Sequence, residues 1–75
     1  MKRIHPAVKR FAVRLKELRE QQGWTQDDLA GELECDRAYV SQLERGLQNP
    51  SLITLVRIAA VFAVDLTFGD AKLTN

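Results

Sequence analysis

Apolar residues recur at intervals of three and four positions near the start of the chain, the spacing of one face of an α-helix. Pro6 suits the first turn of such a helix, where its missing N–H is not needed, and Gly23 marks the end. The pattern predicts a helix over about 6–22. Its inward residues are Val8, Phe11, Ala12, Leu15 and Leu18.

Two independent signals indicate the start of a second helix. Thr25, followed three positions later by Asp28, forms a capping box in which Asp replaces the usual Glu or Gln. Trp24 before the cap and Leu29 after it have the spacing of a hydrophobic staple. They predict a helix over 26–33, and its inward residues are Leu29, Ala30 and Leu33.

A third helix follows after a very short connection. Asp36 is an N-cap residue, with Cys35 and Val40 at the staple spacing on either side of it. Gly46 provides a residue that closes a helix in the left-handed conformation. The predicted helix spans 37–45, and Val40 and Leu43 are its buried pair. Two helices joined so closely must turn sharply.

Ser51 begins a fourth predicted helix, after which the pattern changes to period two. The expected inner face of that helix consists of Leu52, Leu55, Val56, Ala59 and Phe62. Residues 64–68 alternate apolar and polar side chains and stop at Gly69 and Asp70, which indicates a strand. A lone strand in a helical chain leaves its backbone groups unpaired. We therefore expect antiparallel pairing with a second subunit, through Val64, Leu66 and Phe68.

Size and composition narrow the class of protein. The 75 residues are enough for one domain, and 45% hydrophobic with 28% charged residues indicates a folded chain. No apolar run has the roughly 18 residues of a membrane span, and no secretory signal follows the basic start, so we expect a cytoplasmic protein without membrane contact. Cys35 and His5 are too few and too far apart for a metal site, and no cofactor is expected.

Charge is distributed unevenly along the chain. The net charge is +1, but residues 1–19 hold seven Lys and Arg against one Glu, whereas the remaining 56 residues sum to −5. A basic end suits an anionic partner, and a solvated helix face is the other interpretation.

Three segments together resemble a known family. They are Trp-Thr-Gln-Asp-Asp-Leu-Ala at 24–30, Asp-Arg-Ala-Tyr-Val-Ser-Gln-Leu-Glu-Arg-Gly at 36–46 and Asn-Pro-Ser-Leu at 49–52. Over residues 8–64 the chain is similar to the lambda-repressor and Cro type of helix-turn-helix, the XRE family. The resemblance implies an all-α, compact domain of four to five helices that binds double-stranded DNA as a homodimer.

The resemblance also implies a division of the chain. A basic N-terminal arm would span 1–6 and include His5. The helix-turn-helix domain would span 7–63, with the helix pair at 25–45 and the recognition helix at 37–45. The C-terminal strand or tail would span 64–75. Ala30 is small because the recognition helix crosses close over it.

Roles follow residue by residue from the resemblance. Arg19 and Glu44 match a structural ion pair that orients the recognition helix. The residues that would face base edges are Arg37, Ala38, Ser41 and Gln42. The residues that would contact phosphates are Gln26, Tyr39, Arg45, Gln48 and Asn49. For Tyr39, packing against its own turn is an equal alternative.

The chain departs from the family pattern at two places. Glu34 stands where the family usually has glycine in the turn, and a left-handed conformation there would cost on the order of 1 kcal/mol. The helix pair and its loop are also acidic, which predicts weak non-specific binding to DNA. The basic first helix and the arm would supply part of the missing attraction.

Three functions from different classes remain open. The first is a dimeric repressor that binds an inverted repeat. The second adds an antitoxin role, because residues 23–26 and 64–72 are similar to HipB-type antitoxins, which implies a HipA-type kinase toxin as partner. The third is a protein-interaction module without DNA binding. No nucleophile and base can be paired in this sequence, so an enzyme is not expected.

Overall fold

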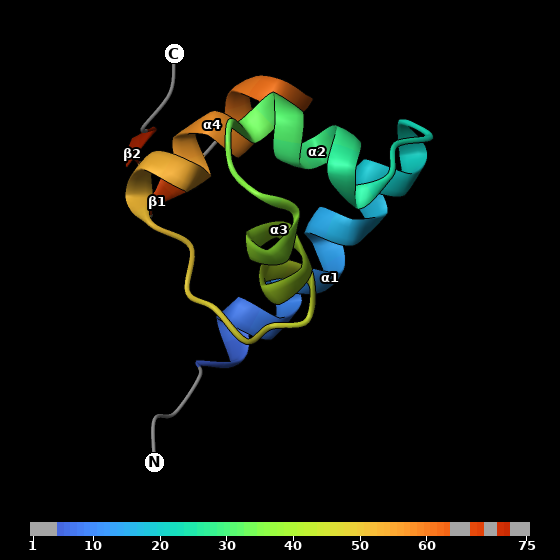
Figure 1. Ribbon diagram of the computed structural model, residues 1–75. Coiled ribbons are helices and arrows are strands. Elements are labelled where there is room, and N and C mark those ends of the chain that lie inside the picture. Colours follow the sequence, from blue (N-terminus) through green and yellow to red (C-terminus); the bar gives the residue numbers. More distant parts are fainter. Residues whose placement is uncertain (1–4, 64–66, 69–70, 73–75) are drawn as a thin grey trace.

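The computed structural model describes residues 5–63 and the backbone of 67–68 and 71–72 (Figure 1). Four helices make up most of this part of the chain, and a two-stranded hairpin follows them, which confirms the predicted all-α class. The helices are α1 (Pro6–Gln21), α2 (Gln26–Leu33), α3 (Arg37–Glu44) and α4 (Leu52–Phe62). The strands are β1 (Thr67–Phe68) and β2 (Ala71–Lys72). No helix among the described residues is long and apolar enough to cross a bilayer.

Side chains cap each of the three later helices, as the sequence predicts. The Thr25 hydroxyl accepts from the Asp28 amide at 3.1 Å, and the Asp28 carboxylate accepts from the Thr25 amide at 2.8 Å. Asp36 caps α3 by accepting from the Tyr39 amide at 2.8 Å, and Ser51 caps α4. Helices of 8 residues are too short to be stable alone, so these caps and the packing hold them.

Helix α1 begins at Pro6, as the sequence predicts, with a cap that the sequence does not signal. His5, assigned to the N-terminal arm, is the N-cap residue of α1, and its Nδ1 accepts from the Ala7 amide at 3.0 Å. Histidine is not among the usual capping residues, and for this reason the sequence signal is weak. The ordered helix therefore begins with a cap one residue before Pro6, and residues 1–4 lie outside the described part.

The core lies where α3 meets α1 and α2, and α2 also contacts α4. In Figure 1, α3 occupies the middle of the view, with α2 and α4 above it. Leu29, Val40 and Leu43 have no exposed surface, and Leu15 and Ala30 are nearly as buried. The inward faces predicted for the first three helices are confirmed, and small Ala30 lies in the core beside α3's buried pair.

The inner face predicted for α4 is wrong at two positions. Leu52 and Val56, expected inside, are 59% and 37% exposed, whereas Ile58 and Ala59 are buried. Leu55 and Phe62 are partly buried, and the Phe62 ring lies 5.7 Å from that of Trp24. Apart from one threonine and one arginine, α4 is entirely apolar, so several faces satisfy the helical period and contacts with the rest of the fold select one.

The strand at 64–68 is only partly described, and its expected isolation is wrong. Thr67 and Phe68 form β1, but β1 pairs antiparallel with β2 of the same chain, Thr67 opposite Lys72 and Phe68 opposite Ala71. Val64 and Leu66 lie outside the described residues. The sequence signal for the hairpin is the Gly-Asp pair between the two strands, a two-residue hairpin sequence that we assigned to the end of a strand.

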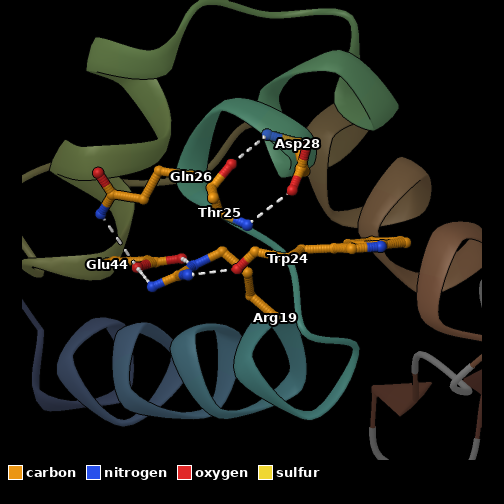
Figure 2. Close-up of polar contacts among 6 residues, drawn as sticks. All are labelled: Arg19, Trp24, Thr25, Gln26, Asp28 and Glu44. Carbon is orange, nitrogen blue, oxygen red and sulfur yellow. Dashed lines mark hydrogen bonds and ion pairs between the residues drawn. The ribbon is translucent and has the colours of Figure 1, made fainter.

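A buried ion pair joins α1 to the end of α3 (Figure 2). Arg19 donates to Glu44 twice, from Nε to Oε2 at 2.7 Å and from Nη2 to Oε1 at 3.0 Å. The side chains are 11% and 2% exposed, and Arg19 Nη1 also donates to the Trp24 carbonyl at 2.7 Å. The hydrogen bond that Arg19 donates to Glu44 raises the pKa of Arg19, and burial opposes that effect. The pair is thus fully bonded, and it connects three parts of the fold.

The turn between α2 and α3 contains the strained residue that the sequence predicts. Glu34 is the C-cap of α2 in the left-handed conformation, with φ 56° and ψ 43°. It is exposed, and the backbone of the turn closes through Cys35 N to Ala30 O at 3.0 Å. A side chain with Cβ raises the energy of this conformation, and the tight connection requires it.

Replacing Glu34 with glycine should stabilise the fold. We expect Glu34→Gly to be more stable than Glu34→Ala by about 1 kcal/mol, because both remove the charge and only glycine removes the strain. Urea unfolding would measure the difference. Gly46→Ala is the opposite control and should destabilise the fold, because Gly46 has φ +70° and an added Cβ would lie 3.5 Å from Lys9 Cγ. Equal stability of the two Glu34 variants would contradict this account.

Breaking the ion pair from one side should cost more than removing it. Arg19→Met or Glu44→Leu alone leaves a buried unpaired charge and should destabilise the fold by about 3 to 5 kcal/mol. Arg19→Met/Glu44→Leu should recover much of this loss. Urea unfolding of the three variants forms a double-mutant cycle. Additive losses would show that the two side chains do not act as a pair.

Candidate nucleic-acid interface

The outer face of α3 presents the four residues predicted to read bases. Arg37, Ala38 and Gln42 are exposed and Ser41 is half-buried. Positions 37 and 41, and likewise 38 and 42, are four residues apart, so the four share one side of the helix. The opposite side carries the fully buried Val40 and Leu43. The polar face is therefore turned away from the core and open to a partner.

The end of α3 is closed by a Schellman motif, which places the following loop. Gly46 N donates to Leu43 O at 3.2 Å, and Leu47 N donates to Gln42 O at 3.0 Å. Gly46 is buried and has φ +70°, as the sequence predicts. Arg45, Gln48 and Asn49, three of the predicted phosphate contacts, are exposed around this turn.

Lys9 is a residue that sequence reasoning missed at this end of α3. A Cβ built on Gly46 would lie 3.5 Å from Lys9 Cγ, so the aliphatic part of Lys9 approaches the turn after α3 while the residue remains exposed. This brings one cation of the basic first helix beside the loop of predicted phosphate contacts. No local pattern could have revealed it, because the contact joins residues 37 positions apart in sequence.

Tyr39 has a partner within the protein. Its ring packs against the core cluster, and its hydroxyl lies 3.3 Å from Thr54 Oγ1 at the start of α4. Thr54 Oγ1 also accepts from the Ser51 hydroxyl at 2.9 Å. The half-buried Tyr39 thus links α3 to the first turn of α4, so its hydroxyl has a partner in another helix and not in its own turn.

Gln26, the first residue of α2, is directed at α3. Its side-chain Nε2 donates to Glu44 Oε1 at 3.2 Å, and the residue is half-buried (Figure 2). The family resemblance predicts a phosphate contact for Gln26 and gives no sign of this bond to Glu44. The Glu44 carboxylate therefore accepts hydrogen bonds from Arg19 of α1 and from Gln26 of α2. Three predicted site residues thus meet at one point.

The surface around the helix pair is mostly acidic. Two arginines of the pair, Arg37 and Arg45, are exposed at the two ends of α3. The exposed acidic residues are Asp27, Asp28, Glu32, Glu34 and Asp36. Asp27 and Asp28 stabilise the first turn of α2, where a negative charge interacts favourably with the helix dipole.

Cys35 is the other chemically reactive side chain near the helix pair, and its surroundings do not activate it. Cys35 is partly buried against the core, and burial, helped by Asp36, raises the pKa of its thiol, while Arg57 opposes the rise. A thiol with a raised pKa is a poor nucleophile at neutral pH. Within the part of the chain described here, no three His, Cys, Asp or Glu residues gather as metal ligands would.

Known proteins resemble the chain over most of its length. The sequence profile of the helix-turn-helix family matches residues 15–68. The regulator DdrOP3 of Deinococcus deserti is 43% identical over 68% of this chain and 40% of its own length. The antitoxin HipB of Escherichia coli O6:H1 is 36% identical over 77% of the chain and 62% of its own length. The chain thus spans about half the length of these two relatives.

Restriction-modification controller proteins match more completely. The control protein C.MunI of a Mycoplasma species is 37% identical over 84% of this chain and 89% of its own length. The crystal structure of C.AhdI from Aeromonas hydrophila superposes with a TM-score of 0.74 and 35% identity. The match covers 80% of this chain and 91% of the C.AhdI chain. The structure of C.Esp1396I, as a tetramer in complex with its natural 35 base-pair operator, superposes with a TM-score of 0.72 and 30% identity. The match covers 80% of this chain and 79% of the C.Esp1396I chain.

The four helices and the short capped helix pair α2 and α3 agree with these likenesses. The chain therefore belongs to the helix-turn-helix family of the XRE type.

Proposed function

We propose that the protein is a sequence-specific DNA-binding transcriptional regulator that acts as a repressor in the cytoplasm. The observation that supports this most directly is the open polar face of α3, whose opposite side is fully buried. A helix of this kind, fixed at its inner face and free at its outer face, fits the major groove. The operator complex of C.Esp1396I, a protein 30% identical to the chain, supports the same use of the fold.

Each residue of the outer face has a chemistry suited to base edges. Arg37 can donate two hydrogen bonds to guanine, and Gln42 can form a donor and acceptor pair with adenine. The Ala38 methyl can contact the methyl group of thymine, and the Ser41 hydroxyl can bond several bases. Arg37 and Gln42 are exposed, as such contacts require.

Phosphate contacts would set the register of the domain without reading sequence. Arg45, Gln48 and Asn49 lie on the exposed turn after α3, near Lys9 of α1. Gln26 stands at the N-terminus of α2, where free backbone amides favour an anion. Tyr39 is the least available of the predicted set, because its hydroxyl is near Thr54.

A dimer would read an inverted repeat with half-sites about one helical turn apart. Two surfaces are candidates for its interface. The first is the tail, through Val64, Leu66 and Phe68, which would extend the hairpin sheet across a two-fold axis. The second is the outer face of α4, where Leu52, Ile53 and Val56 are 59%, 64% and 37% exposed. Exposed apolar side chains grouped on one helix favour burial in an assembly.

An antitoxin role is the second candidate function. HipB matches the chain at 36% identity, and a HipA-type kinase toxin would then be the partner. The near full-length matches to C.MunI and C.AhdI instead favour a regulator without a toxin. Affinity purification of the full chain from its natural host distinguishes the two, because only an antitoxin should recover a kinase in stoichiometric amount.

Gel-shift on the protein's own promoter tests the main proposal. A regulator should shift that fragment at a concentration at least tenfold below the one that shifts unrelated DNA of equal length. Identical shifts, or none, would favour a protein-interaction module that has kept the fold.

Arg37→Ala should remove discrimination at a single base position. We expect the wild-type protein to lose about 1 to 3 kcal/mol of binding free energy when the guanine contacted by Arg37 is replaced, and the variant to lose almost nothing there. Fluorescence anisotropy with a panel of single-base operator variants measures this. Gln48→Ala is the matched control and should weaken binding to the whole panel by one factor. A panel profile unchanged by Arg37→Ala would contradict the assigned role.

Leu66→Asp should produce monomers if the tail forms the dimer interface. A buried carboxylate at a two-fold axis faces its own copy, so both desolvation and repulsion oppose association. Light scattering over a range of protein concentrations gives the oligomeric state. Ile53→Asp tests α4 in the same way. A Leu66→Asp protein that remains dimeric while Ile53→Asp is monomeric would transfer the interface to α4.

A further inference from the structure

Gln26 occupies an unusual place for a residue expected to contact only phosphate. It directly follows the N-cap Thr25, whose side chain accepts from the Asp28 amide, so the first turn of α2 is held firmly. From this turn its side chain reaches Glu44, the last residue of α3. One end of the recognition helix is therefore bonded to the first residue of the helix that precedes it.

Glu44 is held from two helices at once. Arg19 of α1 bonds both carboxylate oxygens, and Gln26 of α2 bonds Oε1 at 3.2 Å (Figure 2). The Glu44 side chain is 2% exposed, so water competes little for these bonds. Hydrogen bonds to a charged group are stronger than those between neutral groups, which makes the Gln26 bond more than a chance contact.

The apolar contacts at the inner face of α3 do not by themselves fix the rotation of the helix about its axis. Val40 and Leu43 fix the distance of the helix from the core, but apolar contacts have no preferred direction. A small rotation of this 8-residue helix about its own axis would keep both side chains in the core and still shift its outer side chains. Hydrogen bonds at its end are directional and limit that rotation.

We propose that Gln26 is a positioning residue of the recognition helix: through Glu44 it fixes the rotation of α3, and hence the direction in which Arg37 and Gln42 point. This inference rests on the proposed DNA-binding function. It adds to the phosphate contact, because an amide has two N–H donors and Glu44 uses one of them. Loss of Gln26 should then change which sequence is bound, as well as how tightly.

The specificity ratio separates positioning from two simpler roles. It compares affinity for the operator with affinity for unrelated duplex of the same length at the same salt concentration. A lost phosphate contact lowers both affinities by one factor, and so does a smaller folded fraction. Only a displaced reading face lowers the ratio.

The experiment compares how Gln26→Met and Gln48→Met bind an operator that has been selected from a random pool of DNA. Methionine keeps the length of glutamine and removes its hydrogen bonds, and Gln48 is an exposed predicted phosphate contact on the loop after α3. By fluorescence anisotropy we expect the specificity ratio of Gln26→Met to fall about three- to tenfold, and that of Gln48→Met to stay constant. An unchanged ratio for Gln26→Met would overturn the proposal.

Hydrogen exchange in the free protein decides the same point without DNA. Gln26→Met should speed the exchange of the α3 amides, including Arg45 N, which donates to Ser41 O, and leave those of α1 near their wild-type rates. Equal protection of α3 in both methionine variants would overturn the link. If the wild-type protein selects no operator, the proposed function fails, whereas this measurement still tests whether Gln26 positions α3.

Discussion

The carboxylate of Glu44 is the point on which the helix-turn-helix geometry depends. Helix α3 has two turns, too few to be stable alone, and its position is set by what it touches. Apolar contacts hold its inner face, whereas Arg19 and Gln26 hold its last residue from two different helices. The guanidinium extends the connection to the Trp24 carbonyl, so the turn before α2 belongs to the same network. A polar network in the interior thus determines where the outer face points.

Local signals account for what could be predicted from the sequence. N-caps and a closing glycine act within four residues, so Thr25, Asp36, Ser51 and Gly46 could be assigned from neighbours alone. The inner faces of the first three helices were also predictable, because polar residues separate their apolar positions. The prediction of the Arg19–Glu44 contact comes from the family resemblance. Neither periodicity nor spacing indicated it.

Features that depend on tertiary contacts could not be read in this way. The nearly all-apolar α4 fits the helical period on several faces, and so Leu52 and Val56 were placed inside although the fold exposes them. The Gly-Asp pair at 69–70 fits both a hairpin and the end of a strand, so the sequence alone does not decide whether β1 pairs within the chain or with a second copy. The bond from Gln26 to Glu44 spans 18 positions and involves residue types with many other uses.

The acidic surface of the helix pair has a consequence for selectivity in the proposed regulator. Non-specific binding to DNA is almost entirely electrostatic, whereas operator binding adds base contacts that depend little on surface charge. Repulsion between phosphates and the exposed acidic residues of α2 opposes both kinds of binding by a similar free energy, so it lowers the two affinities by about the same factor and leaves their ratio to the base contacts. Genomic DNA offers a vast excess of competing sites, so the ratio of the two affinities governs occupancy. A protein of 75 residues with few base contacts therefore depends on those contacts for discrimination, and they form fully only when α3 is held in one orientation.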